Sequence, residues 1–403
     1  MKKSFIMRSY YPRRNFIKLG SAAALSLASG AAGHAQTTVK TTQAEPDGYF
    51  TVGRRNGRWW LVDPKGTPFF SIGLNHIDSA TLRYEDNRHI WDNKYKNDMK
   101  KWLSGAVRKD LRSWGFNTVG WNQEYVVHGH NHSRSFTPEE YKWLDMPYGH
   151  MLRFSETHQW DAITRHPNIM SAEFEDWCDY VARDDCGRLK NDPNLIGYYF
   201  TDCPTWVHTR PRNEWKGPLF DPDKLKTGAG KRELTKIATR YYTVIHDAIR
   251  RYDPHHLILG DRYEAMAPLP EEIVTAAMPY VDVFNFQCFN QPDEIKRRLT
   301  RWADFTKKPV ILADSAGWIK SDPHDNWPAD DEWHQDPDWY VETMDSMRDI
   351  PGCVGFHLCG AYLRNLTRNY GLRDNFERID ENAVPKITEK NKEVERWVKD
   401  QTG

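Results

Sequence analysis

The sequence shows no excess of charge of either sign and no long apolar segment after its first residues. Its 403 residues include 56 Lys and Arg and 56 Asp and Glu, so the formal net charge is zero. A nucleic-acid-binding surface normally carries a basic excess, and an acidic tail carries the opposite, so neither is favoured. A membrane-spanning helix needs about 20 consecutive apolar residues, and no later segment offers them. We therefore expect no nucleic-acid partner and no membrane anchor.

Cysteine pairs and cofactor fingerprints are also lacking. None of the six cysteines forms a Cys-x-x-Cys pair, which disfavours a zinc knuckle or a thioredoxin-type site. The sequence has no phosphate-binding loop, no Gly-x-Ser-x-Gly elbow and no nicotinamide fingerprint. His128, His130 and His132 alternate in one segment, but acidic partners at ligand spacing are missing, so a solvated loop explains them better. We expect no cofactor, no metal, and mostly free, buried thiols.

What is present begins with an export signal. The twin arginine Arg13–Arg14 precedes a moderately apolar segment, "SAAALSLASGAA", that ends in small residues. This pattern is typical of a twin-arginine (Tat) signal peptide, here residues 1–35, and a disordered basic tail is the alternative. The apolar segment is too short and too rich in Ala and Ser for a stable anchor. We expect residues 36–403 to reach the periplasm or the medium as a mature protein.

Eight short apolar runs follow, most of them separated by helical patterns. The runs are continuous rather than alternating, as buried parallel strands are. They lie at residues 69–75, 117–122, 150–154, 195–200, 256–261, 281–287, 308–314 and 353–359. Helical patterns lie at residues 96–114, 172–189, 231–252, 294–305, 338–348 and 385–399. Eight strands alternating with helices predict an α/β fold, a (β/α)8 (TIM) barrel that occupies 36–403 as one domain.

Two further patterns bear on this fold. Residues 48–63 place aromatic and β-branched runs on both sides of Asn56–Gly57, which predicts an N-terminal β-hairpin. A doubly wound open sheet is the alternative to the barrel. It would normally carry a Gly-rich turn after its first strand, and residues 73–76, "GLNH", do not form one.

Polar side chains gather where the predicted strands end, which is where a TIM barrel builds its active site. The candidate catalytic residues are Asp202, Asp314 and Glu124, and the candidate substrate-binding residues are Asn75, His76, Asn122, Trp206, Arg262, Tyr263, Gln287, Trp318 and His357. Two carboxylates can supply the acid and the base or nucleophile of glycoside hydrolysis, amides bind hydroxyl groups, and indoles stack on sugar faces. Simpler interpretations remain, because Asp at a strand end can cap a helix, Glu124 can be a loop carboxylate, and both Trp residues can be packing.

Several segments resemble the exo-acting β-agarases of glycoside hydrolase family 50 and their clan A relatives. "GRWWLVDPKGTPFFSIGLN" and "DLRSWGFNTVGWN" look like the opening of these enzymes, and "PNLIGYYFTD", "LILGDRY", "KPVILAD" and "VGFHL" fall at strands four, five, seven and eight. The resemblance implies a retaining barrel enzyme with an Asn–Glu acid/base pair after strand four and a Glu nucleophile after strand seven. This sequence departs from it twice, with Asp202–Cys203 at the first place and Asp314 at the second.

These departures leave several functions open. We expect an exported glycoside hydrolase that cleaves oligosaccharides of galactan, agar-type or related glycans, with Asp202 or Glu124 as the acid because Cys203 cannot readily protonate a sugar oxygen. A carbohydrate lyase is an alternative, with Asp314, His76 or Tyr263 as its base, and a non-catalytic glycan-binding barrel is another. Because Asp is shorter than Glu, two aspartates would widen the carboxyl gap toward the roughly 6.5–9.5 Å of inverting enzymes.

Overall fold

A closed barrel of eight parallel strands forms the centre of the fold. The computed structural model describes residues 48–122, 126–127, 131–132, 135–155, 167–204, 206, 221–321, 333–365 and 369–402. The strands, in barrel order, are β4 (Ser71–Leu74), β5 (Thr118–Val119), β8 (Tyr148–Met151), β9 (Leu195–Asp202), β10 (Leu257–Glu264), β11 (Phe284–Gln287), β12 (Val310–Ser315) and β15 (Cys353–Leu358). β15 pairs with β4 in parallel and closes the ring, so the predicted barrel is confirmed and the open sheet is wrong.

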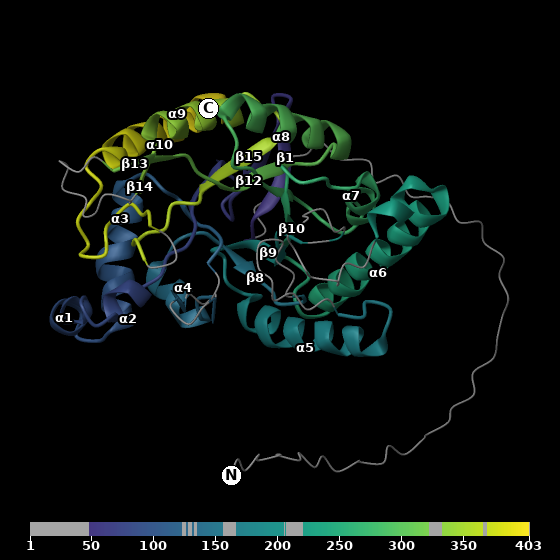
Figure 1. Ribbon diagram of the computed structural model, residues 1–403, viewed down its shortest axis with the longest axis horizontal. Coiled ribbons are helices and arrows are strands. Elements are labelled where there is room, and N and C mark those ends of the chain that lie inside the picture. The colour runs from purple at the N-terminus through teal and green to yellow at the C-terminus, as the bar shows by residue number, and fades with distance from the viewer. Residues whose placement is uncertain are drawn as a thin grey trace, which may run out of the picture. The chain divides into compact units, whose positions relative to one another are not determined.

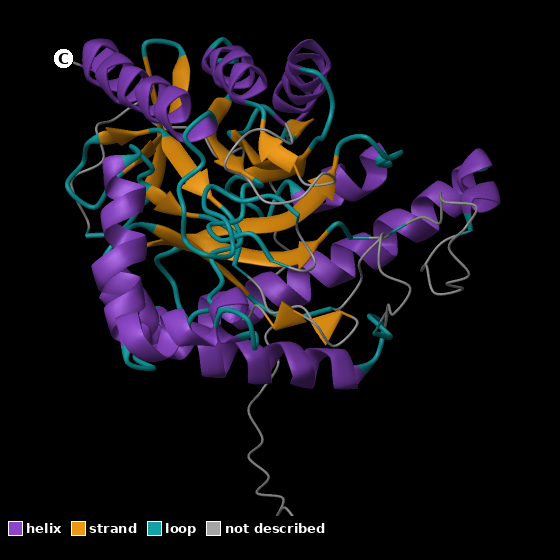
Figure 2. Cartoon of the chain, turned by 60° about the vertical axis from the view of Figure 1, so that its left-hand side comes forward, coloured by secondary structure: helices purple, strands orange, loops and turns teal. Residues whose placement is uncertain are grey.

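Helices cover the outside of this ring of strands (Figures 1 and 2). They are η1 (Ala80–Arg83), α1 (Arg88–Ile90), η2 (Trp91–Tyr95), α2 (Met99–Trp102), η3 (Leu103–Val107), α3 (Arg108–Ser113), α4 (Pro138–Leu144), α5 (Ala172–Leu189), η4 (Pro222–Lys226), α6 (Gly228–Tyr252), α7 (Glu271–Ala277), α8 (Pro292–Thr306), α9 (Pro337–Arg348) and α10 (Ala383–Thr402). The single helix predicted at residues 96–114 is instead three segments, of which η3 is π-helical. α4 and α7 were not predicted, since seven residues give little periodicity.

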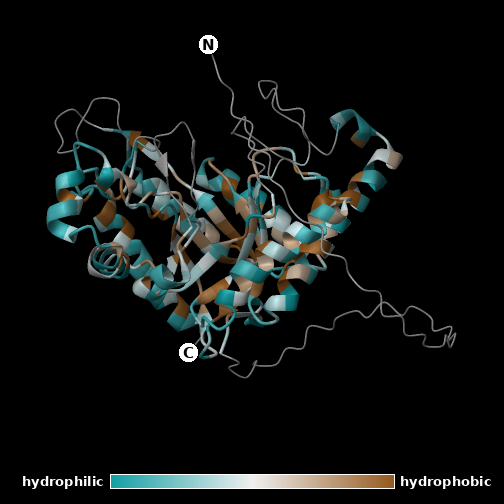
Figure 3. Ribbon diagram, turned by 90° about the horizontal axis from the view of Figure 1, so that it is seen from below, coloured by the Kyte–Doolittle hydropathy of each residue, from teal (hydrophilic) through white to brown (hydrophobic). Residues whose placement is uncertain are grey.

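The long helix α6 illustrates why these segments form where they do. The side chain of Thr227 caps its first turn by accepting a hydrogen bond from the backbone N–H of Gly230 (3.1 Å). Buried residues then recur at helical spacing, among them Leu234, Ala238 and Ile245. Figure 3 shows the same division along the outer helices, whose hydrophobic residues lie toward the strands and whose hydrophilic residues lie away from them. Within the described part of the chain, no helix combines the length and the apolar character needed to cross a membrane.

The predicted hairpin closes the end of the barrel opposite the strand carboxyl ends. β1 (Thr51–Arg55) and β2 (Arg58–Val62) pair in antiparallel through Asn56 and Gly57, which both have positive φ as a tight hairpin turn requires. β3 (Pro68–Phe69) adds a third strand. Leu61 packs in one buried cluster with Leu257 and Ile311, which lie at or near the starts of β10 and β12. The hairpin is therefore a plug beneath the barrel.

Two small antiparallel sheets lie in the loops, β6 (Val126–Val127) with β7 (Asn131–His132), and β13 (Trp318–Lys320) with β14 (Trp333–Gln335). The proposed signal peptide (residues 1–35), Glu124, His128 and His130 lie outside the described residues. All six cysteines are described, and each is a free, buried thiol, as the sequence predicted.

Candidate active site

A small cavity lies at the carboxyl ends of neighbouring strands β9 to β12. It measures about 200 Å³ and takes a polar side chain from the last residues of each of these strands: Asp202, Glu264, Gln287 and Asp314. The rest of its lining is His76, Cys203, Met266, Phe289, Cys359 and Tyr370. Four residues that the sequence singled out, from loops and strands far apart along the chain, are thus brought together here: His76, Asp202, Gln287 and Asp314.

The buried guanidinium of Arg262 links the two aspartates of the cavity. Its Nη1 lies 3.0 Å from Asp202 Oδ1, and its Nη2 lies 3.1 Å from Asp314 Oδ2. The guanidinium carbon also lies 4.3 Å from the ring centroid of Trp121, a cation–π contact inside the barrel. Because Arg262 is fully buried, water does not screen these pairs. Arg262, predicted to bind substrate, therefore serves first to hold both carboxylates in place.

Asp314 is fixed from three sides and stays ionised. Asn75 Nδ2 donates to its Oδ1 (2.6 Å), while Asn75 Oδ1 accepts from the backbone N–H of Trp121 (2.7 Å). His76 Nε2 lies 3.9 Å from Asp314 Oδ2. Burial alone would raise the pKa of Asp314, but Arg262, His76 and Asn75 together hold that pKa well below its usual range. An ionised carboxylate in this position can act as a base or a nucleophile.

Asp202 is the last residue of strand β9 and Cys203 follows it, and the two side chains differ in chemistry. Gln287 Nε2 donates to Asp202 Oδ1, so that oxygen contacts both an amide and Arg262. Cys203 has a left-handed backbone (φ 42°) and donates its backbone N–H to Arg262 O (3.1 Å). Burial, and then the nearby Asp202 and Glu264, raise the pKa of the Cys203 thiol well above its ordinary value. A thiol in that state is a neutral group and a poor acid.

Glu264 is the lining carboxylate that sequence reasoning missed. The fifth strand was predicted to end at Asp261, but β10 runs three residues further. A bulge at Gly260 (φ 68°) shifts the register, after which Arg262 contacts Trp121 inside the barrel. Residues i and i+2 of a strand share a face, so Glu264 points inward as Arg262 does. The signal available in the sequence was this glycine followed by four strand-compatible residues.

The same alternation corrects the position of Tyr263. Its hydroxyl contacts the hydroxyl of Tyr242 on α6 (2.6 Å), and Tyr242 also donates to Asp261 (2.7 Å). Both β10 side chains therefore lie in the layer between barrel and helices. Tyr263 does not line the cavity, and the sequence placed it there because the bulge was not recognised.

Three other predicted substrate contacts also lie away from the cavity lining. Trp206 is 4% exposed and packs edge-on against Tyr241, with ring centroids 5.0 Å apart. Of the two roles considered for Trp206, sugar stacking and packing, this position favours packing. His357 contacts Ser71 Oγ through Nε2 (2.8 Å), and burial, with Arg262, lowers its pKa to about 3, so the ring is neutral. Asn122 is buried at the end of the segment that follows β5.

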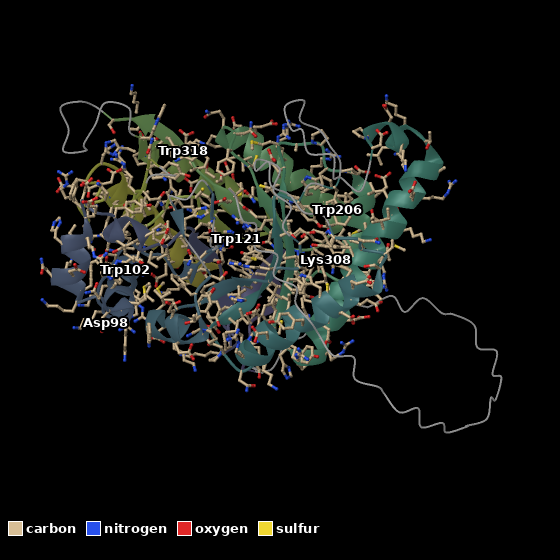
Figure 4. The ribbon with its side chains drawn as sticks, turned by 60° about the horizontal axis from the view of Figure 1, so that its bottom comes forward. Asp98, Trp102, Trp121, Trp206, Lys308 and Trp318 are labelled. Carbon is tan, nitrogen blue, oxygen red and sulfur yellow. The ribbon has the colours of Figure 1, made fainter. Side chains whose placement is uncertain are left out.

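Aromatic rings gather beside the cavity around Trp318. Trp318 stacks on Phe289, with centroids 5.9 Å apart and planes 14° apart, and its ring lies 5.0 Å from that of Tyr370. Phe289 and Tyr370 themselves line the cavity, so Trp318 extends an apolar surface from it. In Figure 4, Trp318 and Trp206 lie on opposite sides of Trp121. Of the two tryptophans, Trp318 has the position suited to stacking on a sugar.

One side of the cavity could hold a metal ion. His76, Asp314 and Cys359 each offer a ligand atom, these atoms lie within 4.8 Å of one another, and all three residues are buried. Imidazole nitrogen, carboxylate oxygen and thiolate sulfur are the donor types that zinc accepts. Arg262 already pairs with Asp314, so a cation would compete with the guanidinium there.

A larger surface hollow of about 760 Å³ is lined by residues of the outer helices α5 and α6. Its charged side chains are paired with one another: Arg240 with Glu175, and Arg251 with Asp179. The paired charges and the position on outer helices make it a weaker candidate than the strand-end cavity.

Comparisons with known proteins support the fold. No family model matches the chain. The β-agarase B of Vibrio sp. (strain JT0107) is 20% identical over 428 residues, covering 77% of this chain and 44% of the agarase. A solved exo-β-agarase superposes with a TM-score of 0.66 at 17% identity, covering 87% of this chain and 65% of its own. A second agarase gives a TM-score of 0.63 at 16% identity, with 90% and 65% covered.

The chain therefore spans less than half of the curated relative and about two thirds of these structures. The resemblance to the family 50 agarases, stated above from sequence segments, is confirmed as a resemblance in sequence and in barrel fold.

Proposed function

We propose that this chain is a glycoside hydrolase that cleaves oligosaccharides of galactan, agar-type or related glycans, and that it is exported to act on them. The observation that carries the proposal is the strand-end cavity, in which two fixed carboxylates, Asp202 and Asp314, share one buried guanidinium. Glycoside hydrolysis needs carboxyl groups on both sides of the scissile bond. The likeness to agarases supports the choice of glycan.

The cavity's dimensions support action at a chain end. Its volume of about 200 Å³ falls below the roughly 300–1,000 Å³ of typical ligand pockets. Such a space suits one sugar ring better than the middle of a long chain, and Trp318 beside it offers a surface for the next ring. We therefore favour removal of terminal units over internal cleavage.

The position of Tyr263 counts against the lyase alternative. An eliminating enzyme needs a base at the substrate, and Tyr263, one of its candidates, lies outside the cavity behind β10. Asp314 and His76 remain at the cavity, so the distinction depends on the products.

The test is product analysis on agar-derived and other galactan oligosaccharides, followed by NMR of the anomeric carbon. Hydrolysis should yield saturated reducing sugars, and inversion of configuration would support the wider gap expected of two aspartates. A product that absorbs in the ultraviolet would mean elimination instead. Binding without turnover on every glycan would mean a non-catalytic barrel.

A further inference from the structure

The resembled family has a glutamate where this chain has Cys203, so a proton donor must come from elsewhere if the chain hydrolyses glycosides. A thiol kept neutral by burial does not supply one efficiently. Asp314 is held ionised by Arg262 and Asn75. Asp202 contacts the same guanidinium and an amide donor, so its carboxylate is already engaged by two neighbours.

Glu264 comes from the adjacent strand to the neighbourhood of Cys203. β9 and β10 are parallel neighbours in which Asp202 is in register with Arg262. Cys203 bonds to the backbone of Arg262, and Glu264 follows two residues later on the same inward face. Both Cys203 and Glu264 line the cavity. The carboxyl group of Glu264, on the neighbouring strand β10, therefore lies on the same side of the cavity as Cys203.

Glu264 is a third carboxyl group in the cavity, beside the two aspartates. Glu264 is 7% exposed, and the cavity it shares holds two further acidic residues, Asp202 and Asp314. Arg262 pairs with both of these aspartates. In a pair of catalytic carboxyl groups, one is the general acid and the other is the base or nucleophile, and Asp314 already fits the second role.

We propose that Glu264, on the strand next to β9, is the general acid of this site. Cys203 cannot fill that role. Its carboxyl proton passes to the glycosidic oxygen as the bond from the anomeric carbon to that oxygen breaks. A water oxygen forms the new bond to the anomeric carbon, and a proton of that water passes to a carboxylate. One water is consumed, and no cofactor or oxidant is required. This inference rests on the proposed function.

The experiment compares the full chain with its Glu264→Gln and Glu264→Asp variants on two kinds of substrate. One is an agar-derived oligosaccharide, whose leaving sugar oxygen needs a proton. The other is 2,4-dinitrophenyl β-galactoside, whose leaving group does not. Glu264→Gln should lower kcat/KM about 10²–10⁴-fold on the first and less than about tenfold on the second. In the Glu264→Gln variant, the alkaline limb of the pH profile of kcat/KM on the oligosaccharide should also vanish.

Glu271→Gln is the matched control, because Glu271 is an exposed glutamate on the next helix, paired with Arg301 on the surface. It should leave both rates unchanged. Thermal melting of each variant separates loss of chemistry from loss of fold, and Glu264→Asp, which keeps the carboxyl group, should retain part of the oligosaccharide rate.

Four results would overturn the assignment. Near-normal oligosaccharide cleavage by Glu264→Gln would remove Glu264 from the chemistry and leave the hydrolase proposal intact. Equal losses on both substrates in both variants would reduce Glu264 to a positioning residue. If Glu124→Gln instead gave the leaving-group signature, the donor would be Glu124. An inactive wild-type chain on every substrate would end both proposals together.

Discussion

The guanidinium of Arg262 lies between Asp202 and Asp314, and its burial makes each of these ion pairs part of the fold as well as of the site. Removing one partner of a buried pair leaves an uncompensated charge, which typically costs about 3–5 kcal/mol. Substitutions here are therefore expected to alter stability together with activity. The sequence placed both aspartates at the ends of predicted strands, but it did not show that each is only 5% exposed.

Asp314→Asn is the substitution that tests the base or nucleophile. It keeps the shape of the side chain and removes the charge that Arg262 and Asn75 stabilise. We expect kcat to fall about 10²–10⁴-fold on the oligosaccharide, together with a lower melting temperature. Asp293→Asn, on the exposed first turn of α8, is the control and should change neither. Activity near the wild-type value in Asp314→Asn would remove this residue from the mechanism.

Zinc should inhibit the enzyme through His76, Asp314 and Cys359. A tetrahedral zinc ion with bonds of about 2.0–2.3 Å holds its ligand atoms roughly 3.3–3.7 Å apart. His76 Nε2 and Asp314 Oδ2 lie 3.9 Å apart, close to that range. Binding would displace Arg262 from Asp314 and occupy the base. Cys359→Ser should raise the inhibitory zinc concentration at least about tenfold, whereas Cys288→Ser, outside the cluster, should not. Equal zinc sensitivity in both variants would contradict the site.

At the scale of elements, the strands were predictable because each is a continuous apolar run that a buried parallel strand requires. Helix α5 (Ala172–Leu189) has the bounds that its pattern predicted, and α8 and α9 differ by one or two residues at their ends. The bulge at Gly260 was not predictable in the same way, since its register shift depends on pairing with β9. That one glycine decides which β10 side chains face the cavity, and so why Tyr263 was misplaced and Glu264 missed.

Asp261 of strand β10 is a buried acid that accepts hydrogen bonds from helix α6, and its ionisation should weaken the fold. Burial raises the pKa of Asp261 to about 7, with hydrogen bonds from Tyr242 and Tyr241 offsetting part of the effect. The folded state then binds more protons than the unfolded state, in which the pKa is about 3.9. Stability is therefore fully present below about pH 4 and is lost as the pH rises through about 7, by roughly 4 kcal/mol at most from this group.

Asp261→Asn should flatten this dependence. The measurement is the free energy of unfolding by denaturant at a series of pH values from about 5 to about 8. The wild-type chain should lose stability over this range, and the variant should lose much less. Asp247→Asn, a substitution of an exposed acid on helix α6, is the control and should keep the wild-type slope. If Asp261→Asn and the wild-type chain have parallel profiles, Asp261 does not titrate as its burial requires.

At the scale of the whole molecule, the hairpin and the cavity occupy opposite ends of the barrel. The hairpin places Leu61 against Leu257 and Ile311 at the closed end. The carboxylates lie at the other end, where β10 and β12 finish. Sequence could give this polarity, because every parallel strand points the same way and polar residues follow the apolar runs. The sequence could not show that Arg262 pairs with both Asp202 and Asp314, because those ion pairs depend on distances in the folded structure.

The six free thiols bear on how the chain would leave the cytoplasm. All six are buried in the folded protein, and an unfolded chain would expose them to an oxidising compartment, where disulfides form. A Tat route exports proteins already folded, so buried thiols would stay reduced.

We expect Arg13→Lys with Arg14→Lys to retain the protein in the cytoplasm of a Tat-competent bacterial host, as measured by fractionation and immunoblotting. Arg8→Lys, outside the twin arginine, is the control and should be exported normally. Periplasmic recovery of the double variant at the wild-type level would contradict a Tat route, and disulfides in the exported wild-type protein would contradict export in the folded state.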